Sequence, residues 1–469
     1  MRLTKIVATL GPASWSEEQI RSLTKAGMNV ARINFSHGNT EQHRGTIQRI
    51  KQLNEKEGLG LAILLDTKGA EVRTGEVATP ILITKGQEVL FSTTEQHDKN
   101  RATITLNYPH FAKDAKDTDR ILLDNGELTF AIVSIDGEVV VARAKQDGKI
   151  GSRRHVNLPG AYITLPAMMD ADWVDLAMGM EEGADYVALS FIRAVDEVEQ
   201  VRKFLREGGS DMKIITKVEY RQALDNIDAM IAASDGIMVA RGDLGAEIPF
   251  EKVPAAQDMM VEKCRKAGKP VIVATHMLES MINHPMPTRA EATDVAHAAK
   301  TRTDATMLSG ETATGINPVV ALEAMAKILE ETEKILTPPT LPLVGAPDDE
   351  YIARAEAAVA MAHSLNATAI VAITRSGRTA KALARCRSTI PVLTFTPEAA
   401  VQRELQLYYG ILPTLVKLDA DLDISAMQVM DLVTEKWGFA PGTRIVFVAG
   451  SKGPHGKIGN VQILSLIHI

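Results

Sequence analysis

The chain has 469 residues, 45% of them hydrophobic and only 4% aromatic, so it can bury large cores built mainly from aliphatic side chains. A formal net charge of -7 argues against a generally basic nucleic-acid-binding surface, and two cysteines are too few for a disulfide framework or a zinc site. With no signal-peptide pattern and no apolar run long enough to span a bilayer, we expect a cytoplasmic protein of two or three domains that binds neither nucleic acid nor membrane.

The first 69 residues repeat a unit of apolar strand, polar tip and helix, which is typical of parallel β/α structure. We predict strands at residues 5–10, 30–38 and 61–69, the last two ending in polar residues, with helices at about 16–27 and 41–57. From residue 70 to 158 the segments become short and rich in Val, Ile and Thr, and Asx–Gly turns separate them. This stretch is predicted to be an inserted β-barrel-like domain.

The strand–helix repeat resumes in residues 159–336, where five further strands are predicted near 184–190, 214–219, 237–240, 270–275 and 304–309. Eight parallel β/α units close into a (β/α)8 TIM barrel, whose active site lies at the carboxyl ends of the strands. A Pro-rich join follows. Residues 337–469 carry three more strands separated by helices, which predicts a smaller C-terminal α/β domain.

Charged side chains mark the ends of two neighbouring barrel strands. Lys217 and Glu219 end one strand, and Asp243 follows the next at the predicted transition from strand to loop. The flanking Gly242 and Gly245 leave room for a ligand to approach the backbone. Two carboxylates beside a cation suit Mg²⁺ held jointly with a substrate oxygen. A cluster of surface salt bridges is the competing interpretation.

Two arginines and a set of oxygen-bearing side chains lie at or just beyond the tips of the first strands. Arg32 and Arg73 suit a phosphate clamp, because a guanidinium matches phosphate oxygens bidentately. The oxygen-bearing residues, which suit a hard cation, are Asn34, Ser36, Asp66 and Thr67. A capped turn at residues 34–38 and a surface ion pair at Arg73 are the alternatives, and each is favoured when taken alone.

A second candidate site lies in the C-terminal domain, where a polar loop follows a strand and opens a helix. The loop consists of Thr374, Arg375, Ser376, Gly377, Arg378 and Thr379. Backbone N–H groups, hydroxyls and two arginines at a helix N-terminus favour a phosphate, and the distance in sequence from the barrel tips favours a regulatory role. An ordinary helix cap is the alternative.

Taken together, these stretches resemble the pyruvate kinase family nearly from end to end. The resemblance rests on ARINFSHG (31–38), LDTKGAEVR (65–73), VNLPG (156–160), MVARGDLG (238–245), MLESM (277–281), PTRAE (287–291) and MLSGET (307–312). It implies the bacterial-type architecture of a barrel (1–69 and 159–336), an inserted lid (70–158) and a C-terminal regulatory domain (337–469), usually in a homotetramer.

The resemblance also implies an activity, the transfer of the phosphoryl group of phosphoenolpyruvate to ADP, which gives pyruvate and ATP. The implied catalytic residues are Arg32, Arg73, Lys217 and Thr275, with substrate also bound at Gly242 and Asp243. Glu219 and Asp243 would hold Mg²⁺ or Mn²⁺, and the oxygen-bearing set at the first strand tips would hold K⁺. The residues implied to face the nucleotide are Asn34, His37, Arg73 and Arg154, and a phosphorylated effector would bind the 374–379 loop.

Several positions depart from the usual family pattern: Ala70 for proline, Asn125 for aspartate, Arg154 for lysine, His155 for glycine, Tyr220 for asparagine and His276 for glutamine. The ending from Gln462 to Ile469 also lacks the usual approach to the last strand, and nothing is inferred from it. Glu71 is the position that indicates K⁺ dependence, because family members with glutamate there generally require K⁺ and those with lysine generally do not.

Two other functions compete with this interpretation. One is a Mg²⁺-dependent aldolase or lyase barrel, although carbon–carbon chemistry on an unphosphorylated acid needs no phosphate clamp. The other is a catalytically weakened paralogue that senses sugar phosphates or nucleotides through its C-terminal domain. The substitutions keep the second alternative open, whereas the presence of the implied phosphate, metal and substrate residues counts against it.

Overall fold

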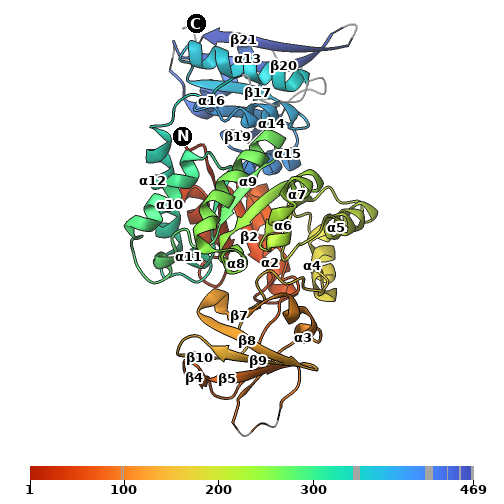
Figure 1. Ribbon diagram of the computed structural model, residues 1–469. Helices are drawn as coiled ribbons and strands as arrows, with labels where there is room; N and C mark the ends of the chain where they lie inside the picture. The colour runs from red at the N-terminus through yellow and green to blue at the C-terminus, as the bar shows by residue number, and fades with distance from the viewer. Residues whose placement is uncertain are drawn as a thin grey trace.

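The computed structural model describes residues 1–469 except 97, 99, 342–348, 418–425, 441, 454–455 and 466–469. It also leaves out the side chains of residues 125, 426–427, 430, 450–460 and 465. The departure at Asn125 and the last residues of the chain therefore lie outside the described part. Figure 1 shows the barrel in the middle of an elongated molecule, with the inserted β domain at one end and the C-terminal sheet at the other.

Eight parallel strands close the barrel in the order β1, β16, β15, β14, β13, β12, β3 and β2. Their bounds are β1 Lys5–Leu10, β2 Val30–Asn34, β3 Ala62–Asp66, β12 Tyr186–Leu189, β13 Lys213–Val218, β14 Gly236–Ala240, β15 Val271–Ala274 and β16 Ala305–Leu308. The predicted (β/α)8 barrel is confirmed, and its eight strands are the eight counted in the sequence.

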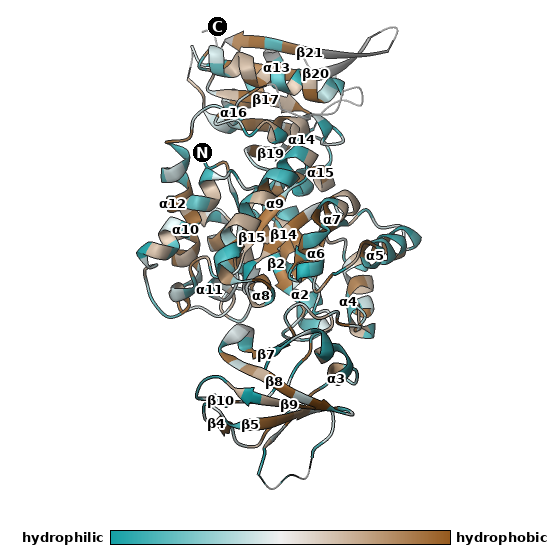
Figure 2. Cartoon of the chain, in the orientation of Figure 1, coloured by the Kyte–Doolittle hydropathy of each residue, from teal (hydrophilic) through white to brown (hydrophobic). Residues whose placement is uncertain are grey.

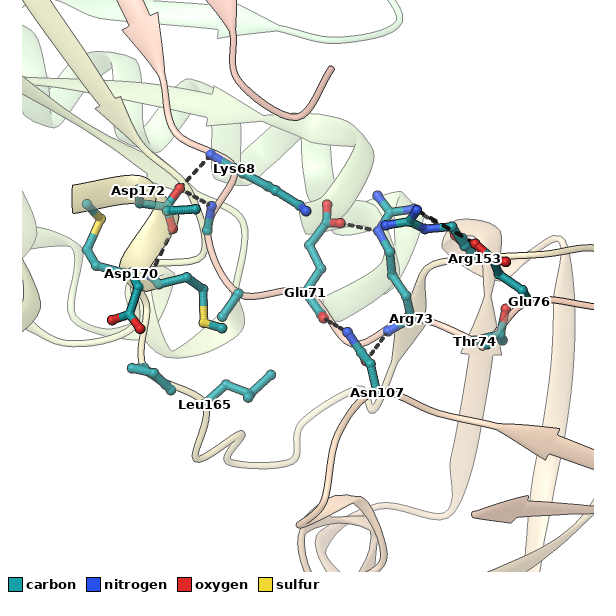
Figure 3. A pocket seen from close by; sticks show the side chains of 17 residues that line it. Lys68, Glu71, Arg73, Thr74, Glu76, Asn107, Arg153, Leu165, Asp170 and Asp172 are labelled. Carbon is teal, nitrogen blue, oxygen red and sulfur yellow. Dashed lines mark hydrogen bonds and ion pairs between the residues drawn. The ribbon is translucent and has the colours of Figure 1, made fainter. Parts of the chain in front are cut away.

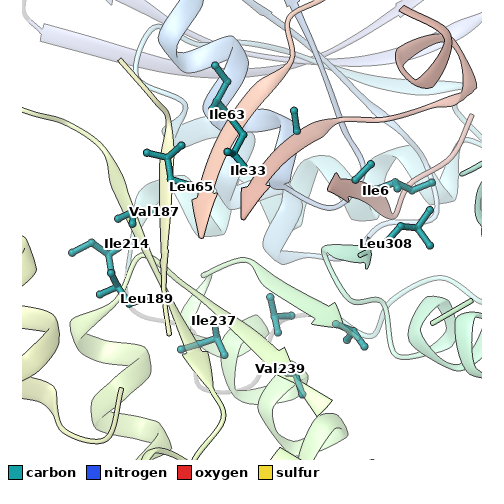
Figure 4. Packing of buried hydrophobic residues seen from close by; sticks show 14 of the residues in the cluster. Ile6, Ile33, Ile63, Leu65, Val187, Leu189, Ile214, Ile237, Val239 and Leu308 are labelled. Carbon is teal, nitrogen blue, oxygen red and sulfur yellow. The ribbon is translucent and has the colours of Figure 1, made fainter. Parts of the chain in front are cut away.

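Side chains alternate along each strand between the surrounding helices and the barrel interior. Ile33, Leu65 and Ile214 belong to the large core beneath the helices, part of which Figure 4 shows. Val30, Leu64 and Ile215 fill the interior instead. In Figure 2 the central strands β2, β14 and β15 are accordingly brown, among helices with much teal. Two residues beyond this interior layer, the same inward face delivers polar side chains to the mouth of the barrel.

The helices around the barrel are α1 Glu17–Ala26, α2 Thr40–Glu57, α4 Asp170–Glu181, α5 Val195–Glu207, α6 Arg221–Asp225, α7 Ile227–Ala233, α8 Arg241–Glu247, α9 Val253–Ala267, α10 Arg289–Lys300, α11 Gly310–Ala313 and α12 Pro318–Glu333. The predicted limits of the first helix hold, because the Ser16 side chain accepts from the backbone N–H of Gln19 and Gly27 ends the helix at a φ of 113°. The placement of Asp243 at a strand-to-loop transition was wrong. Helix α8 follows β14 directly, so Asp243 lies in its first turn.

The inserted domain is a six-stranded sheet in the order β11, β7, β8, β9, β5 and β6, beside a two-stranded pair of β10 and β4. The bounds are β4 Ile81–Ile83, β5 Glu88–Ser92, β6 Thr103–Thr105, β7 Arg120–Leu123, β8 Leu128–Asp136, β9 Val139–Ala144, β10 Gly148–Ile150 and β11 Val156–Asn157, with one short helix, α3 Phe111–Asp114. The strands pair antiparallel, except that β5 and β6 run parallel.

The C-terminal domain is a five-stranded sheet in the order β19, β18, β17, β20 and β21. Its elements are α13 Glu350–Ser364, β17 Ala369–Ile373, α14 Arg378–Arg385, β18 Val392–Thr396, α15 Ala399–Glu404, β19 Ile411–Leu415, α16 Ala426–Trp437, β20 Arg444–Gly453 and β21 Gly456–Ser465. Two of these strands, β19 and the antiparallel β21, were not predicted. None of the described helices combines the length and apolar character that a membrane crossing needs.

Candidate active site

Asp66 links two cations at the mouth of the barrel. Its Oδ2 accepts from Arg32 Nε at 2.6 Å, and its Oδ1 lies 3.0 Å from Lys217 Nζ. Arg32 lies two residues beyond the interior Val30, and Lys217 lies two beyond the interior Ile215. The two-residue period of a strand therefore brings both cations to one carboxylate.

The charges in this group support one another. Burial disfavours the charge of Lys217, but the carboxylates of Asp66 and Glu219 raise the pKa of its ammonium above the ordinary value. Burial likewise opposes the charge of Asp66, and the charges of Arg32 and Lys217 hold the pKa of its carboxyl below the ordinary value. The mouth of the barrel therefore keeps a fixed, water-poor pair of positive charges.

Ser190 is a member of this cluster that the sequence interpretation missed. Its hydroxyl lies 2.7 Å from Lys217 Nζ and donates to the Thr67 backbone oxygen at 2.6 Å. It follows β12 directly, so the rule applied to the other strand ends was available for it. The next residue, Phe191, has a φ of 58° and donates its backbone N–H to Glu219 Oε2 at 2.6 Å. Ser190 and Phe191 thus position Lys217 and Glu219.

Glu219 and Asp243 are suited to share a divalent cation. Burial raises the pKa of both carboxyls, and the negative charge of Asp243 raises the pKa of Glu219 further. Glu219 Oε1 lies 2.9 Å from Lys217 Nζ, yet it accepts no well-aligned hydrogen bond from the described residues. The described part of the chain holds no cluster of three protein ligands for a metal, so two carboxylates would need substrate oxygens or water to complete the coordination.

Thr275 occupies a strained turn after β15. Thr275 and His276 have φ values of 68° and 53°, which side chains other than glycine rarely adopt. The Thr275 hydroxyl accepts from the backbone N–H of Gly242 at 2.8 Å, so it lies against the start of α8. The guanidinium of Arg241 fixes the turn by donating to the Thr275 backbone oxygen at 2.6 Å. Arg241 stood in a quoted motif, but its bracing role was not predicted.

The residues predicted to hold K⁺ lie side by side, since Asn34 and Asp66 are register partners on β2 and β3. Asn34 Oδ1 accepts from the backbone N–H of Ser36 at 3.2 Å, which matches the capped-turn alternative. Thr67 Oγ1 accepts from the backbone N–H of Ser190 at 3.0 Å. These contacts do not test the K⁺ assignment, which stays a prediction.

A cleft of about 700 Å³ opens between the lid and the barrel, and Figure 3 shows the residues around it. Arg73 lines it and forms an ion pair with Glu71, while its Nη1 donates to the Arg153 backbone oxygen at 2.8 Å. The negative charge of Glu71 adds to the burial that raises the pKa of the Asp243 carboxyl. Arg73 therefore lies in this cleft, whereas Arg32 lies in the cluster around Lys217.

Arg154 and His155, near the end of the inserted domain, also approach the mouth of the barrel. Arg154 is half-exposed, and its Nη1 lies 3.2 Å from Asp124 Oδ2. His155 is buried, and its Nδ1 lies 3.8 Å from Asp243 Oδ1. His37, which was also predicted to face the nucleotide, is exposed, and its backbone N–H donates to the Asn34 backbone oxygen. The lid thus reaches a candidate metal ligand through His155.

The cluster can be compared with known proteins. The family description "Pyruvate kinase, barrel domain" matches residues 1–322, and "Pyruvate kinase, alpha/beta domain" matches residues 353–464. The chain belongs to the pyruvate kinase family. It is 38% identical to a pyruvate kinase of Dictyostelium discoideum, over 99% of this chain and 94% of that one.

Bacterial and plastid relatives give the same result. A pyruvate kinase of Clostridium acetobutylicum is 39% identical over 96% of both chains. Pyruvate kinase isozyme G, chloroplastic, of Nicotiana tabacum is 38% identical over 97% of this chain and 81% of the relative. This breadth identifies an enzyme of the pyruvate kinase type.

The structure shows the surroundings of three of the departures from the family pattern. Ala70 follows a hinge whose Lys68 and Gly69 backbone N–H groups donate to Asp172 Oδ1 at 3.0 and 3.1 Å, so the hinge is held without a proline. Tyr220 is buried, with its ring centroid 5.8 Å from that of Phe191. His276 is exposed.

The candidate effector loop joins β17 to α14. Gly377 has a φ of 79° and donates its backbone N–H to Thr374 Oγ1 at 2.9 Å, so the loop is internally capped. Arg375, Ser376 and Arg378 are exposed, whereas Thr374 and Thr379 are buried. Arg375 Nε lies 3.9 Å from Glu398 Oε1. The exposed side chains leave the loop open to a ligand, and its effector role stays a prediction.

Proposed function

We propose that this chain transfers the phosphoryl group of phosphoenolpyruvate to ADP and produces pyruvate and ATP. The observation that carries the proposal is the buried pairing of Lys217 with Asp66 and Glu219, next to Arg32 and Asp243. A fixed set of charges in a water-poor site stabilises the charge that develops during phosphoryl transfer.

In the proposed reaction, the bond between phosphorus and the enol oxygen breaks as a bond from a β-phosphate oxygen of ADP to phosphorus forms. Arg32 binds the phosphoryl oxygens as a bidentate donor. Lys217 stabilises the negative charge that appears on the enol oxygen. The resulting enolate carbon takes up a proton and gives pyruvate, and Thr275 lies toward that face of the substrate. The backbone N–H groups near Gly242 and Asp243 receive the substrate carboxylate.

Glu219 and Asp243 fit a divalent ion, because Glu219 is buried and Asp243 half-buried, and the pKa values of both carboxyls are raised. Among the described residues, no donor aligns with Glu219 Oε1. We assign Mg²⁺ or Mn²⁺ to this pair, shared with oxygens of the substrate. Such an ion would neutralise phosphoryl charge and orient the substrate. The protein's part is to hold the two carboxylates on the ends of β13 and the start of α8.

The nucleotide is proposed to occupy the lid–barrel cleft, where Arg73 and Arg154 would approach its phosphates and Asn34 and His37 would lie nearby. K⁺ is assigned to the oxygen-bearing set at the first strand tips, beside the phosphoryl site. Glu71 supports this assignment, since its negative charge near Asp243 increases the need for a cation.

A phosphorylated effector is proposed for the 374–379 loop, because its exposed arginines and hydroxyl lie at the start of a helix. Assembly as a homotetramer and residence in the cytoplasm are the states that we expect for this enzyme. Control of activity would then rest on coupling between the loop and the barrel.

A coupled assay for pyruvate tests the proposal. The purified chain is given phosphoenolpyruvate, Mg²⁺ and K⁺ with and without ADP, and we expect pyruvate only when ADP is present. Formation or cleavage of a carbon–carbon bond without ADP would favour an aldolase or lyase. Binding of sugar phosphates with no turnover at any substrate concentration would favour the sensor alternative.

A further inference from the structure

A second cavity, of about 410 Å³, lies at the junction of the barrel with the C-terminal domain. Three cations line it: Arg265 near the end of α9, Lys300 at the end of α10, and Arg302 in the loop before β16. Ile335 and Leu336, just after α12, form an apolar side. Lys300 and Arg302 precede β16, so the cavity lies toward the amino ends of the barrel strands, away from the carboxyl ends that form the candidate active site. It plays no part in the proposed reaction.

The positive charge of this cavity is only partly neutralised. Of the described residues that line it, none is acidic. Arg265 Nη2 lies 2.9 Å from Glu262 Oε1, on the same helix. Lys300 makes no ion pair within the described ranges, and the guanidinium of Arg302 donates only to backbone oxygens there. An excess of positive charge therefore faces the cavity on a chain whose net charge is -7.

Arg302 keeps its side chain in place at a cost to the backbone. Its φ of 57° lies in the left-handed region, which glycine adopts more easily than arginine. The guanidinium donates to the Arg387 oxygen at 3.2 Å and to the Thr337 oxygen, so it joins the barrel to the C-terminal domain and to the segment between them. Burial lowers the pKa of Arg302, and the like charges of Arg265 and Arg387 lower it further.

Two more arginines lie behind this cavity. Arg385 and Arg387 are 7% and 2% exposed, and the Nε of each has no hydrogen-bond acceptor among the described residues. Arg387 Nη1 lies 2.7 Å from Asp304 Oδ1, and this buried pair ties the C-terminal domain to the amino end of β16. Asp304 pairs with Arg387 and Glu262 pairs with Arg265, so the cations outnumber the carboxylates paired with them in the described ranges. An added anion would relieve the repulsion that remains.

We propose that the cavity lined by Arg265, Lys300 and Arg302 binds a small phosphorylated molecule. Guanidinium groups match phosphate oxygens bidentately, and a lysine adds a mobile point charge. The volume is in the range of small-molecule sites, and Ile335 and Leu336 offer a surface for the carbon skeleton. The site is separate from the 374–379 loop, and it is proposed independently of the catalytic assignment.

Isothermal titration with pyrophosphate in Mg²⁺-free buffer tests this site on the full chain. We expect the unmodified protein to bind one more pyrophosphate per chain than Arg302→Gly, and Lys300→Met to weaken that site at least about tenfold. Glycine accepts the φ of position 302, which offsets part of the loss of the Arg302 hydrogen bonds, and the melting temperature of Arg302→Gly without ligand checks that the variant is folded. Lys327→Met removes an exposed lysine of α12 outside the cavity and serves as the matched control.

Equal stoichiometry and affinity in the unmodified chain, Arg302→Gly and Lys300→Met would overturn the proposal. Loss of binding in Lys327→Met to the same extent would also overturn it, because the effect would then reflect overall charge. Neither result would bear on pyruvate formation, which is measured separately.

Discussion

The Nζ atom of Lys217 lies 2.9 Å from the Oε1 atom of Glu219, within a site where Asp66 contacts the same ammonium. Lys217 is therefore held between two carboxylates rather than free to follow the substrate. If it neutralises charge that grows in the transition state, Lys217→Met should lower kcat by about 10²–10³-fold and raise the KM for phosphoenolpyruvate much less. Steady-state kinetics measure both constants.

The control for this experiment is Lys203→Met, which removes a lysine whose side chain is 76% exposed on α5. It should leave kcat within about twofold of the unmodified chain, as most exposed substitutions do. An unchanged kcat in Lys217→Met would remove Lys217 from the mechanism.

The barrel could be predicted because each strand is a short apolar run followed by a polar tip, and eight such runs leave few other folds. The position of Arg32, Asp66 and Lys217 could be predicted for the same reason, since each lies at the carboxyl end of a barrel strand on the face that points into the barrel. Ser190 satisfied the same rule but was passed over, because a serine after a strand is more often a helix cap.

Other features depended on contacts that no sequence pattern encodes. Arg241 braces the Thr275 turn from 34 residues away, and that turn owes its shape to tertiary hydrogen bonds. A loop was predicted at Asp243 because Gly242 and Gly245 are typical turn residues, whereas the structure has a helix there. Strand β19 contains Pro413, which hid it, and β21 pairs only as an antiparallel partner of β20.

Dependence on K⁺ is predicted to follow the charge of residue 71. The unmodified chain should lose about tenfold or more of its rate in buffer without K⁺ or Na⁺, which corresponds to about 1.4 kcal/mol of transition-state stabilisation. In Glu71→Lys the ammonium supplies a positive charge beside the phosphoryl site, so the ratio of rates with and without K⁺ should approach one. Loss of the Arg73 ion pair should lower the absolute rate of this variant.

Glu76→Lys is the matched control, since Glu76 lines the same cleft and is 80% exposed. It should remain dependent on K⁺. Full activity of the unmodified chain without K⁺ or Na⁺ would refute the charge-replacement explanation.

A phosphorylated sugar or nucleotide is predicted to shift the saturation curve for phosphoenolpyruvate by binding the 374–379 loop. Ser376→Glu should abolish this shift, because its negative charge occupies the place of the phosphate, while the basal rate stays within about twofold. Ser376→Ala, which removes only the hydroxyl, should keep part of the response. A full response in Ser376→Glu would place the effector elsewhere.

Lys5 predicts a pH dependence of stability at the base of the barrel. It is buried and donates to the Ile411 oxygen, and burial followed by the charge of Arg2 lowers its pKa from 10.5 to about 7. Between about pH 7 and pH 10 the unfolded chain therefore binds a proton that the folded chain does not, so the free energy of unfolding should rise with pH by up to about 1.4 kcal/mol per unit. Below about pH 7 Lys5 is charged in both the folded and the unfolded chain, so the stabilisation that it gives at higher pH is absent and the slope from this residue falls to zero.

Urea unfolding at about pH 7, pH 8 and pH 9 measures this slope in the unmodified chain and in Lys5→Met. The variant has no ionisable group at this position, so its free energy of unfolding should rise less steeply over that range. Equal slopes in the two proteins would show that Lys5 stays charged when folded.

A ³¹P NMR time course of phosphoenolpyruvate and ADP with the unmodified chain, Mg²⁺ and K⁺ tests phosphoryl transfer most directly. The phosphoenolpyruvate signal should fall as the γ-phosphorus signal of ATP rises one-to-one, and Lys217→Met should show almost no change over the same period. Appearance of inorganic phosphate in place of ATP, or an unchanged phosphoenolpyruvate signal with the unmodified chain, would contradict the proposed reaction.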